Sequence, residues 1–115
     1  MKLLVVGSRD ITDFDLKPHL PRKLSLIISG GAKGIDTLAE RYADEHGISK
    51  LILRPQYEKY GRAAPLKRNE QMVDLCDSVL VIWDGQSKGS QYTISYAKKA
   101  KKEIQVILFD THSLS

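Results

Sequence analysis

The sequence predicts an α/β fold, a three-layer sandwich built around a five-stranded parallel sheet. Five short apolar runs alternate along the chain with longer stretches of helical periodicity, which is the pattern of βαβ units. Right-handed crossovers then favour the strand order 3-2-1-4-5, a Rossmann-like arrangement. The chain has 115 residues, which is enough for one core, so we expect a single domain over residues 1–115.

The predicted strands are short apolar runs that end at glycine, proline or charged residues. Residues 3–6 are entirely apolar and stop at Gly7, as expected of a strand that is buried on both faces of a parallel sheet. The other expected strands cover residues 24–28, 51–53, 78–83 and 104–109.

The strongest predicted helix covers residues 34–46, where the apolar residues form one stripe of a 3.6-residue period. Gly47 follows it and is suited to a left-handed C-terminal cap. Two further helices are expected at residues 65–76, beginning with Pro65, and at residues 90–102. Residues 12–23 contain two prolines and predict at best a short or irregular helix, and the tail from Thr111 is expected to be loose.

The composition excludes several classes of protein. Hydrophobic residues make up 42% of the chain and charged residues 28%, which is ordinary globular usage. No apolar run approaches the roughly 20 residues that span a bilayer, and no signal peptide is recognisable, so we expect a cytoplasmic protein without a membrane partner. The single Cys76 cannot form an internal disulfide, and no metal or cofactor is implied.

The net charge of +4 is concentrated in one segment of the chain. Residues 50–69 contain six lysines and arginines against one glutamate, 6 − 1 = +5, so the rest of the chain sums to −1. This basic stretch permits a nucleic-acid partner, but Tyr57 and Tyr60 are its only stacking platforms, so nucleic acid is not favoured. The sequence leaves open whether the chain forms a homo-oligomer.

Ligands of doubly wound sheets bind outside the carboxyl ends of the strands where the strand order reverses. Here that point is surrounded by the loops at residues 7–10, 29–36 and 84–90. In the second loop, Gly30, Gly31 and Gly34 lead from Ser29 into the strongest helix, which predicts a cradle for phosphate or carboxylate. The alternative is a tight turn that needs glycine only for its dihedral angles. The spacing matches neither the P-loop nor the G-x-G-x-x-G signature.

The two other loops supply polar groups to the same rim. Gly7, Ser8 and Arg9 follow the first strand, and Arg9 offers a guanidinium suited to a phosphate or a base. The loop after the fourth strand supplies Asp84, Gly85, Gly89 and Ser90. We expect Ser90 to cap the following helix, and Asp84 either to accept bonds from a ribose or base or to form a turn.

The helix that begins near Pro65 has cations in its first turn. Lys67 and Arg68 oppose the helix dipole there, so they indicate an external anion or an acidic neighbour. Asn69 is expected to face the sheet, where a polar group needs a partner. Arg68 and Asn69 are therefore candidate ligand-binding residues.

Four phrases of the sequence, in this order and spacing, resemble the SLOG superfamily: G-S-R-D, S-G-G-A-K-G-I-D-T-L-A, Y-G-R-A-A-P-L-K-R-N-E-Q-M and D-G-Q-S-K-G-S. This superfamily includes the Smf/DprA DNA-processing proteins and the LOG phosphoribohydrolases, and its small YspA/YpsA-related branch is the most similar. The resemblance covers residues 3–109 and implies a Rossmann-like fold and a nucleotide-derived ligand.

The resemblance also assigns roles to single residues. It implies that Gly30, Gly31 and Gly34 form the phosphate loop, with Asp36 as its following acidic residue, and that Arg68 matches the functional arginine of the LOG R-K-x-x-M segment. Thr93 stands where the second LOG motif, P-G-G-x-G-T-x-x-E, has its glutamate.

Three functions follow as hypotheses. The preferred one is binding or sensing of a nucleotide-derived, phosphate-containing small molecule. An alternative is a nucleotide-processing hydrolase that cleaves an N-glycosidic bond, with Asp36 or Asp84 as acid/base. A further alternative is single-stranded nucleic-acid binding like that of DprA. The sequence does not decide whether the chain is an enzyme.

Overall fold

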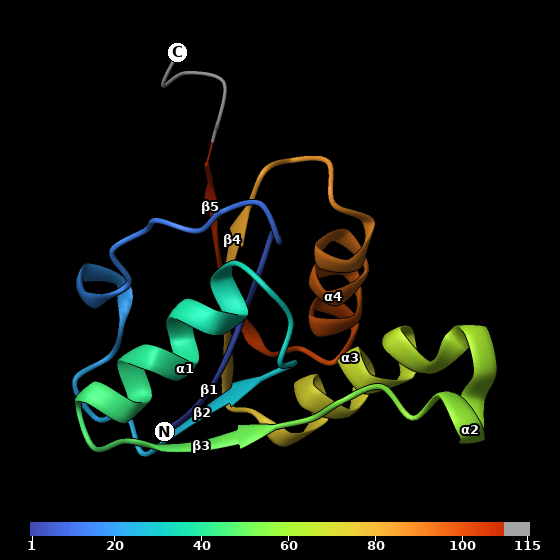
Figure 1. Cartoon of the computed structure of the whole chain (residues 1–115), viewed down its shortest axis with the longest axis horizontal. Helices are drawn as coiled ribbons and strands as arrows, with labels where there is room; N and C mark the ends of the chain where they lie inside the picture. Colours follow the sequence, from blue (N-terminus) through green and yellow to red (C-terminus); the bar gives the residue numbers. More distant parts are fainter. Residues whose placement is uncertain (110–115) are drawn as a thin grey trace.

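A computed structural model describes residues 1–109 of the chain (Figure 1). The strands are β1 (Lys2–Gly7), β2 (Leu26–Ser29), β3 (Ser49–Ile52), β4 (Ser78–Trp83) and β5 (Glu103–Leu108). The helices are α1 (Ile35–Glu45), α2 (Tyr57–Tyr60), α3 (Ala64–Leu75) and α4 (Lys88–Lys99), with the 3₁₀ turns η1 (Lys17–His19) and η2 (Gly61–Ala63). The predicted tail from Thr111 lies outside the described residues.

All five strands are parallel and lie in the order β3-β2-β1-β4-β5, which confirms the predicted topology. Some element boundaries differ from the expectation. β3 begins at Ser49 rather than residue 51, because the pairing with β2 sets Leu26 beside Ser49. α4 begins at Lys88 rather than Ser90, and residues 12–23 contain only the single turn η1.

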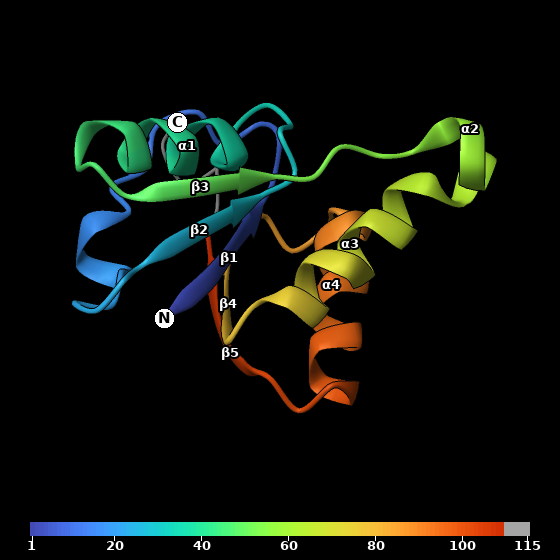
Figure 2. The ribbon, with the colours of Figure 1, turned by 90° about the horizontal axis from the view of Figure 1, so that it is seen from below.

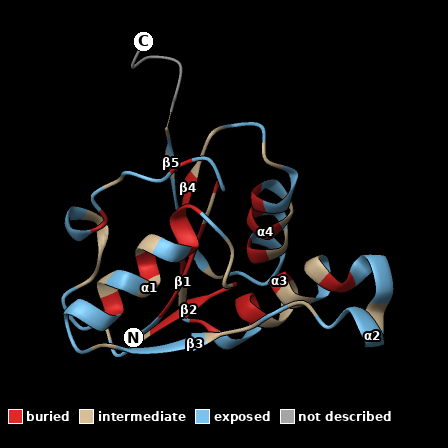
Figure 3. Ribbon diagram, in the orientation of Figure 1, coloured by how far each residue is buried: buried red, intermediate tan, exposed pale blue. Residues whose placement is uncertain are grey.

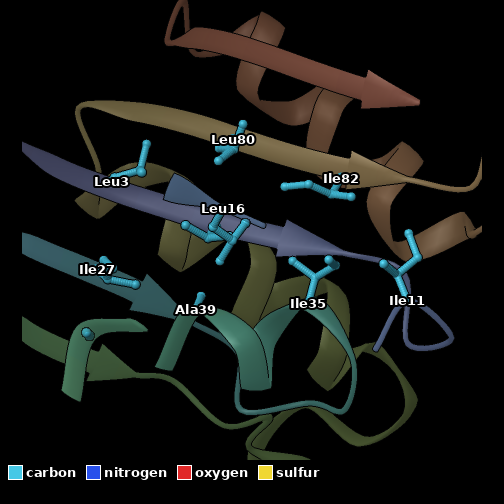
Figure 4. Packing of buried hydrophobic residues seen from close by; sticks show 10 residues of the cluster. Leu3, Ile11, Leu16, Ile27, Ile35, Ala39, Leu80 and Ile82 are labelled. Atoms are coloured by element: carbon cyan, nitrogen blue, oxygen red, sulfur yellow. The ribbon is translucent and has the colours of Figure 1, made fainter. Parts of the chain in front are cut away.

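Helices cover the sheet unequally on its two faces (Figure 2). On one face α1 packs alone over the strands, and the core there is completed by Ile11 and Leu16 from the loop between β1 and β2 (Figure 4). On the other face α3 and α4 pack against β1 and β4 through Met72, Val73 and Ala97. The result is a three-layer sandwich whose buried residues lie mainly in the central strands and the inner faces of the helices (Figure 3).

Residues 57–63, which form α2 and η2, project from the body of the molecule (Figures 1 and 2). Neither element contains a buried residue, and their main contacts are with each other and with α3. We call residues 54–63 the arm. Across residues 1–109, no helix combines the length and the apolar character needed to cross a bilayer.

Candidate functional site

A cavity of about 440 Å³ opens at the carboxyl ends of β1 and β4, between α1, α3 and α4. Nine of the predicted site residues line it: Gly7, Ser8, Arg9, Asp36, Arg68, Asn69, Asp84, Gly89 and Ser90. The other lining residues were not named individually from the sequence, although four of them lie in the three predicted loops: Val6, Asp10, Ala32, Pro65, Leu66, Met72, Gln86, Ser87 and Thr93. The cavity lies at the reversal of strand order, where ligands of such sheets bind.

The N-terminus of α4 opens into this cavity. Ser87 is the N-cap residue and makes no capping bond with its side chain, and the first backbone bond of the helix runs from the Gln91 N–H to the Ser87 oxygen. The preceding N–H groups of the first turn therefore have no partner within the helix. No acidic residue stands in that turn, and a side chain at Gly89 would meet open space. These donors can receive an anion.

Two buried side chains beside this helix end carry polar atoms without a protein partner. Ser90 is 5% exposed and Asn69 8% exposed, and neither the Ser90 hydroxyl nor the Asn69 amide nitrogen is bonded to another group of residues 1–109. Over the same residues, every fully enclosed side-chain nitrogen or oxygen has a partner. The two groups must therefore be reachable from the cavity, where a ligand can bond to them.

The prediction that Ser90 caps α4 was wrong. Ser90 lies inside the first turn of α4, because the helix begins two residues before it, at Lys88. Asp84 forms the turn that precedes the helix: its Oδ1 accepts bonds from the N–H groups of Gln86 and Ser87, each 2.9 Å long. The Trp83 indole also donates to the Ser87 oxygen at 3.0 Å. The turn is thus fixed so that the helix begins at Lys88.

Asp84 is used by this turn. The two backbone N–H groups hold the pKa of its carboxyl below the usual value, and its own N–H donates to the Ser8 hydroxyl at 3.0 Å. Of the two interpretations left open by the sequence, the structure supports turn formation. A carboxylate that is stabilised in its charged form is a poor candidate for a general acid.

The glycine loop after β2 bonds mainly within the protein. The Gly31 N–H donates to the Ser29 hydroxyl at 3.3 Å, and the Ala32 N–H donates to Asp36 Oδ2 at 3.2 Å. The Ser29 hydroxyl in turn donates to Glu40 at 2.9 Å. Five predicted ligand residues do not line the cavity: Ser29, Gly30, Gly31, Gly34 and Gly85. A phosphate cradle made by the glycine loop itself stays a prediction.

Gly34 is required by close packing against backbone, and a side chain at Gly30 would displace the Arg68 guanidinium. A Cβ atom at Gly30 would lie 2.7 Å from Arg68 Nη1, and one at Gly34 would lie 2.5 Å from the carbonyl oxygens of Ser8 and Arg9. Gly34 also has a φ of 74°. Because glycine has no side chain, the loop after β2 can lie directly against the loop after β1 and against Arg68 of α3, and the glycines thereby shape the cavity wall.

Arg68 ties three segments together. Its Nη1 donates to the Gly30 oxygen at 2.7 Å and to the Leu53 oxygen at 3.3 Å, and its Nε donates to Asn69 Oδ1 at 2.9 Å. Burial lowers the pKa of Arg68, while the charge of Asp36 opposes that effect. The guanidinium is therefore a fixed positive charge in the cavity wall.

Asp36 is the perturbed carboxyl of the cavity. It is 6% exposed, and desolvation raises its pKa to about 6 despite the Ala32 N–H and the charge of Arg68, which both lower it. Glu40, one helical turn further along α1, raises it further. Asp36 therefore exchanges a proton near neutral pH, which Asp84 does not. Sequence reasoning missed Glu40, although its spacing of four residues from Asp36 places both on one helix face.

The basic stretch lies mostly outside the cavity. Lys50, Arg54, Lys59, Arg62 and Lys67 are all exposed. Lys50 pairs with Asp44 at 2.8 Å, and Lys67 lies 3.8 Å from Glu70. Tyr57, on the arm, is 60% exposed. Within residues 1–109, no group of three or more histidine, cysteine, aspartate or glutamate side chains is arranged to hold a metal ion.

Comparisons with protein-family models, with curated proteins and with solved structures found no match to this chain. The class of the protein is therefore set by the fold, which is α/β with a Rossmann-like parallel sheet.

Proposed function

We propose that the chain binds a nucleotide-derived, phosphate-containing small molecule in the cavity at the reversal of strand order. The observation that carries this proposal is the set of donors at the N-terminus of α4, where unpaired backbone N–H groups lie beside the accessible Ser90 hydroxyl and Asn69 amide. Such a set stabilises an anion through short hydrogen bonds and the helix dipole.

The electrostatics of the two facing helix ends favour one orientation of the ligand. The first turn of α1 contains Asp36, whereas the first turn of α4 contains no acidic residue. A phosphate is therefore better accommodated at α4. The Asp36 carboxyl is suited to a hydrogen-bond donor such as a sugar hydroxyl or a base amine. Arg68 adds positive charge to the wall of the same cavity.

We also propose that the chain is a member of the SLOG superfamily. Support comes from the position of its motifs, because residues of all four phrases line one cavity although they are far apart in the sequence: Ser8, Asp36, Arg68 and Ser90. Thr93, which stands in place of the LOG glutamate, is buried, and its hydroxyl donates to the Gly89 oxygen at 3.0 Å.

The binding proposal is tested first by native mass spectrometry of freshly purified protein for a retained nucleotide, then by calorimetry with nucleoside 5′-monophosphates and the matching nucleosides. We expect the monophosphates to bind and the nucleosides to bind at least tenfold more weakly. Asn69→Asp adds a negative charge beside α4 and should weaken monophosphate binding by about tenfold. The control Gln71→Glu makes the same chemical change on α3 away from the cavity. Equal affinity for nucleoside and monophosphate, or equal loss in both variants, would contradict the proposal.

A hydrolase is the second candidate, because Asp36 is a buried carboxyl with a pKa of about 6 in the cavity wall. A group of this kind is suited to general acid catalysis near neutral pH. Release of free base from nucleoside monophosphates, lost in Asp36→Asn but retained in Asp84→Asn, would support this function. Binding without base release would support the binding protein.

A further inference from the structure

The strand β5 forms one edge of the sheet and has an unusual outer surface. Its sequence is E-I-Q-V-I-L, without lysine, proline or a bulge between Glu103 and Leu108. Leu108 is 71% exposed and Val106 is 39% exposed. An apolar edge strand with free backbone groups pairs readily with another strand unless a charged or irregular residue blocks it.

The opposite edge of the sheet is protected. β3 has only four residues, Ser49–Ile52, and includes the charged Lys50. The chain then reaches Arg54 and Pro55, and proline cannot donate a ladder hydrogen bond. Growth of the sheet is therefore blocked at β3 and open at β5, so pairing through β5 joins two copies and then stops.

The backbone of β5 defines which of its groups face outward. The Phe109 N–H donates to the Trp83 oxygen at 2.8 Å, so the backbone of Phe109 faces β4. Because alternate residues of a strand direct both backbone groups to opposite sides, Ile107 and Gln105 also face β4. The N–H and C=O groups of Ile104, Val106 and Leu108 therefore face outward and have no partner strand within residues 1–109.

The side chains of the same three residues lie on one face of the sheet. Ile104, Val106 and Leu108 stand beside Val79, Val81 and Trp83 of β4 in the parallel register. These β4 residues belong to the core on the α3 and α4 side. The apolar stripe is thus continuous with that core but extends beyond it at the edge.

We infer that β5 is a self-association edge, at which a second copy of this chain pairs with it in antiparallel orientation about a two-fold axis through Val106. This register sets Val106 against the partner's Val106, and Ile104 against the partner's Leu108. Each outward N–H and C=O then exchanges bonds with the facing residue, as antiparallel geometry requires. A two-fold axis perpendicular to the sheet keeps the apolar stripes of both copies on the same face, where they cover one another.

Charge also favours a second copy in this orientation. Lys98, Lys99 and Lys101 are exposed at the end of the sheet where β5 begins, together with Glu103, whereas Asp84 and Lys88 lie at the end where the neighbouring strand β4 finishes. Antiparallel pairing therefore keeps the lysine-rich ends of the two copies apart, whereas parallel pairing would bring them together. Because the contact follows a single strand, we expect a weak dimer whose population depends on concentration.

Sedimentation velocity across micromolar to submillimolar protein tests the inference. Wild type should show a reversible equilibrium between monomer and dimer. Val106→Pro removes the outward N–H, which has no partner among residues 1–109, and so deletes both bonds donated across the axis. At the usual net strength of such bonds, this variant should weaken the dimer by about thirtyfold.

A second variant keeps the test decisive if the proline disturbs the strand. Leu108→Lys changes a side chain that is 71% exposed, so the monomer should fold, and the added charge opposes the apolar contact. The control is Leu51→Lys on β3, where the leucine is 39% exposed and lies at the opposite edge of the sheet from β5. The control should keep the wild-type equilibrium. A wild-type monomer at all concentrations, larger assemblies, or a dimer that survives Val106→Pro and Leu108→Lys would overturn the inference.

Discussion

The substitution Asp36→Asn tests how the buried carboxyl affects folding. Desolvation raises the pKa of Asp36 from 3.8 to about 6, so the folded protein prefers the protonated form. For a group with a raised pKa, this contribution to stability is fully present below the unfolded pKa and is lost as the pH rises through the folded pKa. The neutral amide of asparagine has the same shape and does not ionise.

The magnitude follows from the two pKa values. The difference 6 − 3.8 = 2.2 corresponds to about 3 kcal/mol of unfolding free energy at about 1.36 kcal/mol per pH unit. The wild-type protein should therefore lose about 3 kcal/mol relative to Asp36→Asn as the pH rises from below 4 to above 6. The asparagine Oδ1 can still accept the bond from the Ala32 N–H, so the loop contact is kept.

Urea denaturation of both proteins between about pH 3 and about pH 8 measures this difference, because this range includes both the unfolded and the folded pKa of Asp36. Other titrating groups contribute to both proteins and cancel. Asp13→Asn, at an exposed aspartate, controls for the loss of one negative charge. A constant difference between wild type and Asp36→Asn, or a wild-type protein that gains relative stability toward neutral pH, would refute the reasoning.

Three further predictions concern the loops, the arm and catalysis. Gly34→Ala should lower the unfolding free energy by about 2–4 kcal/mol, because the added Cβ meets two carbonyl oxygens. Gly47→Ala is also at positive φ but in open space, and it should cost about 1 kcal/mol in the same urea titration. Mononucleotide affinity should vary little with salt concentration and be unchanged by Lys59→Ala or Arg62→Ala. Tight oligonucleotide binding, with a slope of log affinity against log salt of about −0.7 per phosphate contact and a loss of affinity in both variants, would identify the arm as a nucleic-acid surface. Purified protein should release no free base from nucleoside monophosphates in a sensitive chromatographic assay, and release abolished by Asp36→Asn would establish the hydrolase instead.

The sheet and its main helices were predictable because their signals are local. The apolar run of β1 and the stripe on α1 each lie within a few consecutive residues, and the right-handed crossover rule then restricts the strand order. Strand β3 was less well defined, since only Leu51 to Leu53 are apolar and the strand begins in the polar Ser49 and Lys50. Its pairing with β2, a long-range contact, sets that boundary.

The chemistry of the site was only partly predictable, because it depends on side chains that meet from distant segments. No local pattern shows that Arg68 donates to the Gly30 oxygen, or that the Ser8 hydroxyl accepts the Asp84 N–H, because these residues are 38 and 76 positions apart. The cap of α4 is a local ambiguity instead: Ser87 and Ser90 are both suitable residues, and the Asp84 turn decides between them.

The two bonds of Arg68 to backbone carbonyl oxygens and its one bond to a side-chain amide oxygen affect the entropy of ligand binding. Arg68 is already held by Gly30, Leu53 and Asn69 before any ligand arrives. A flexible arginine loses side-chain freedom on binding, whereas this one has lost it during folding, so an anion finds a preorganised charge. Variants that remove these bonds should therefore bind the anion more weakly, even where the changed residue does not contact the ligand, because the freed Arg68 side chain must then be ordered on binding.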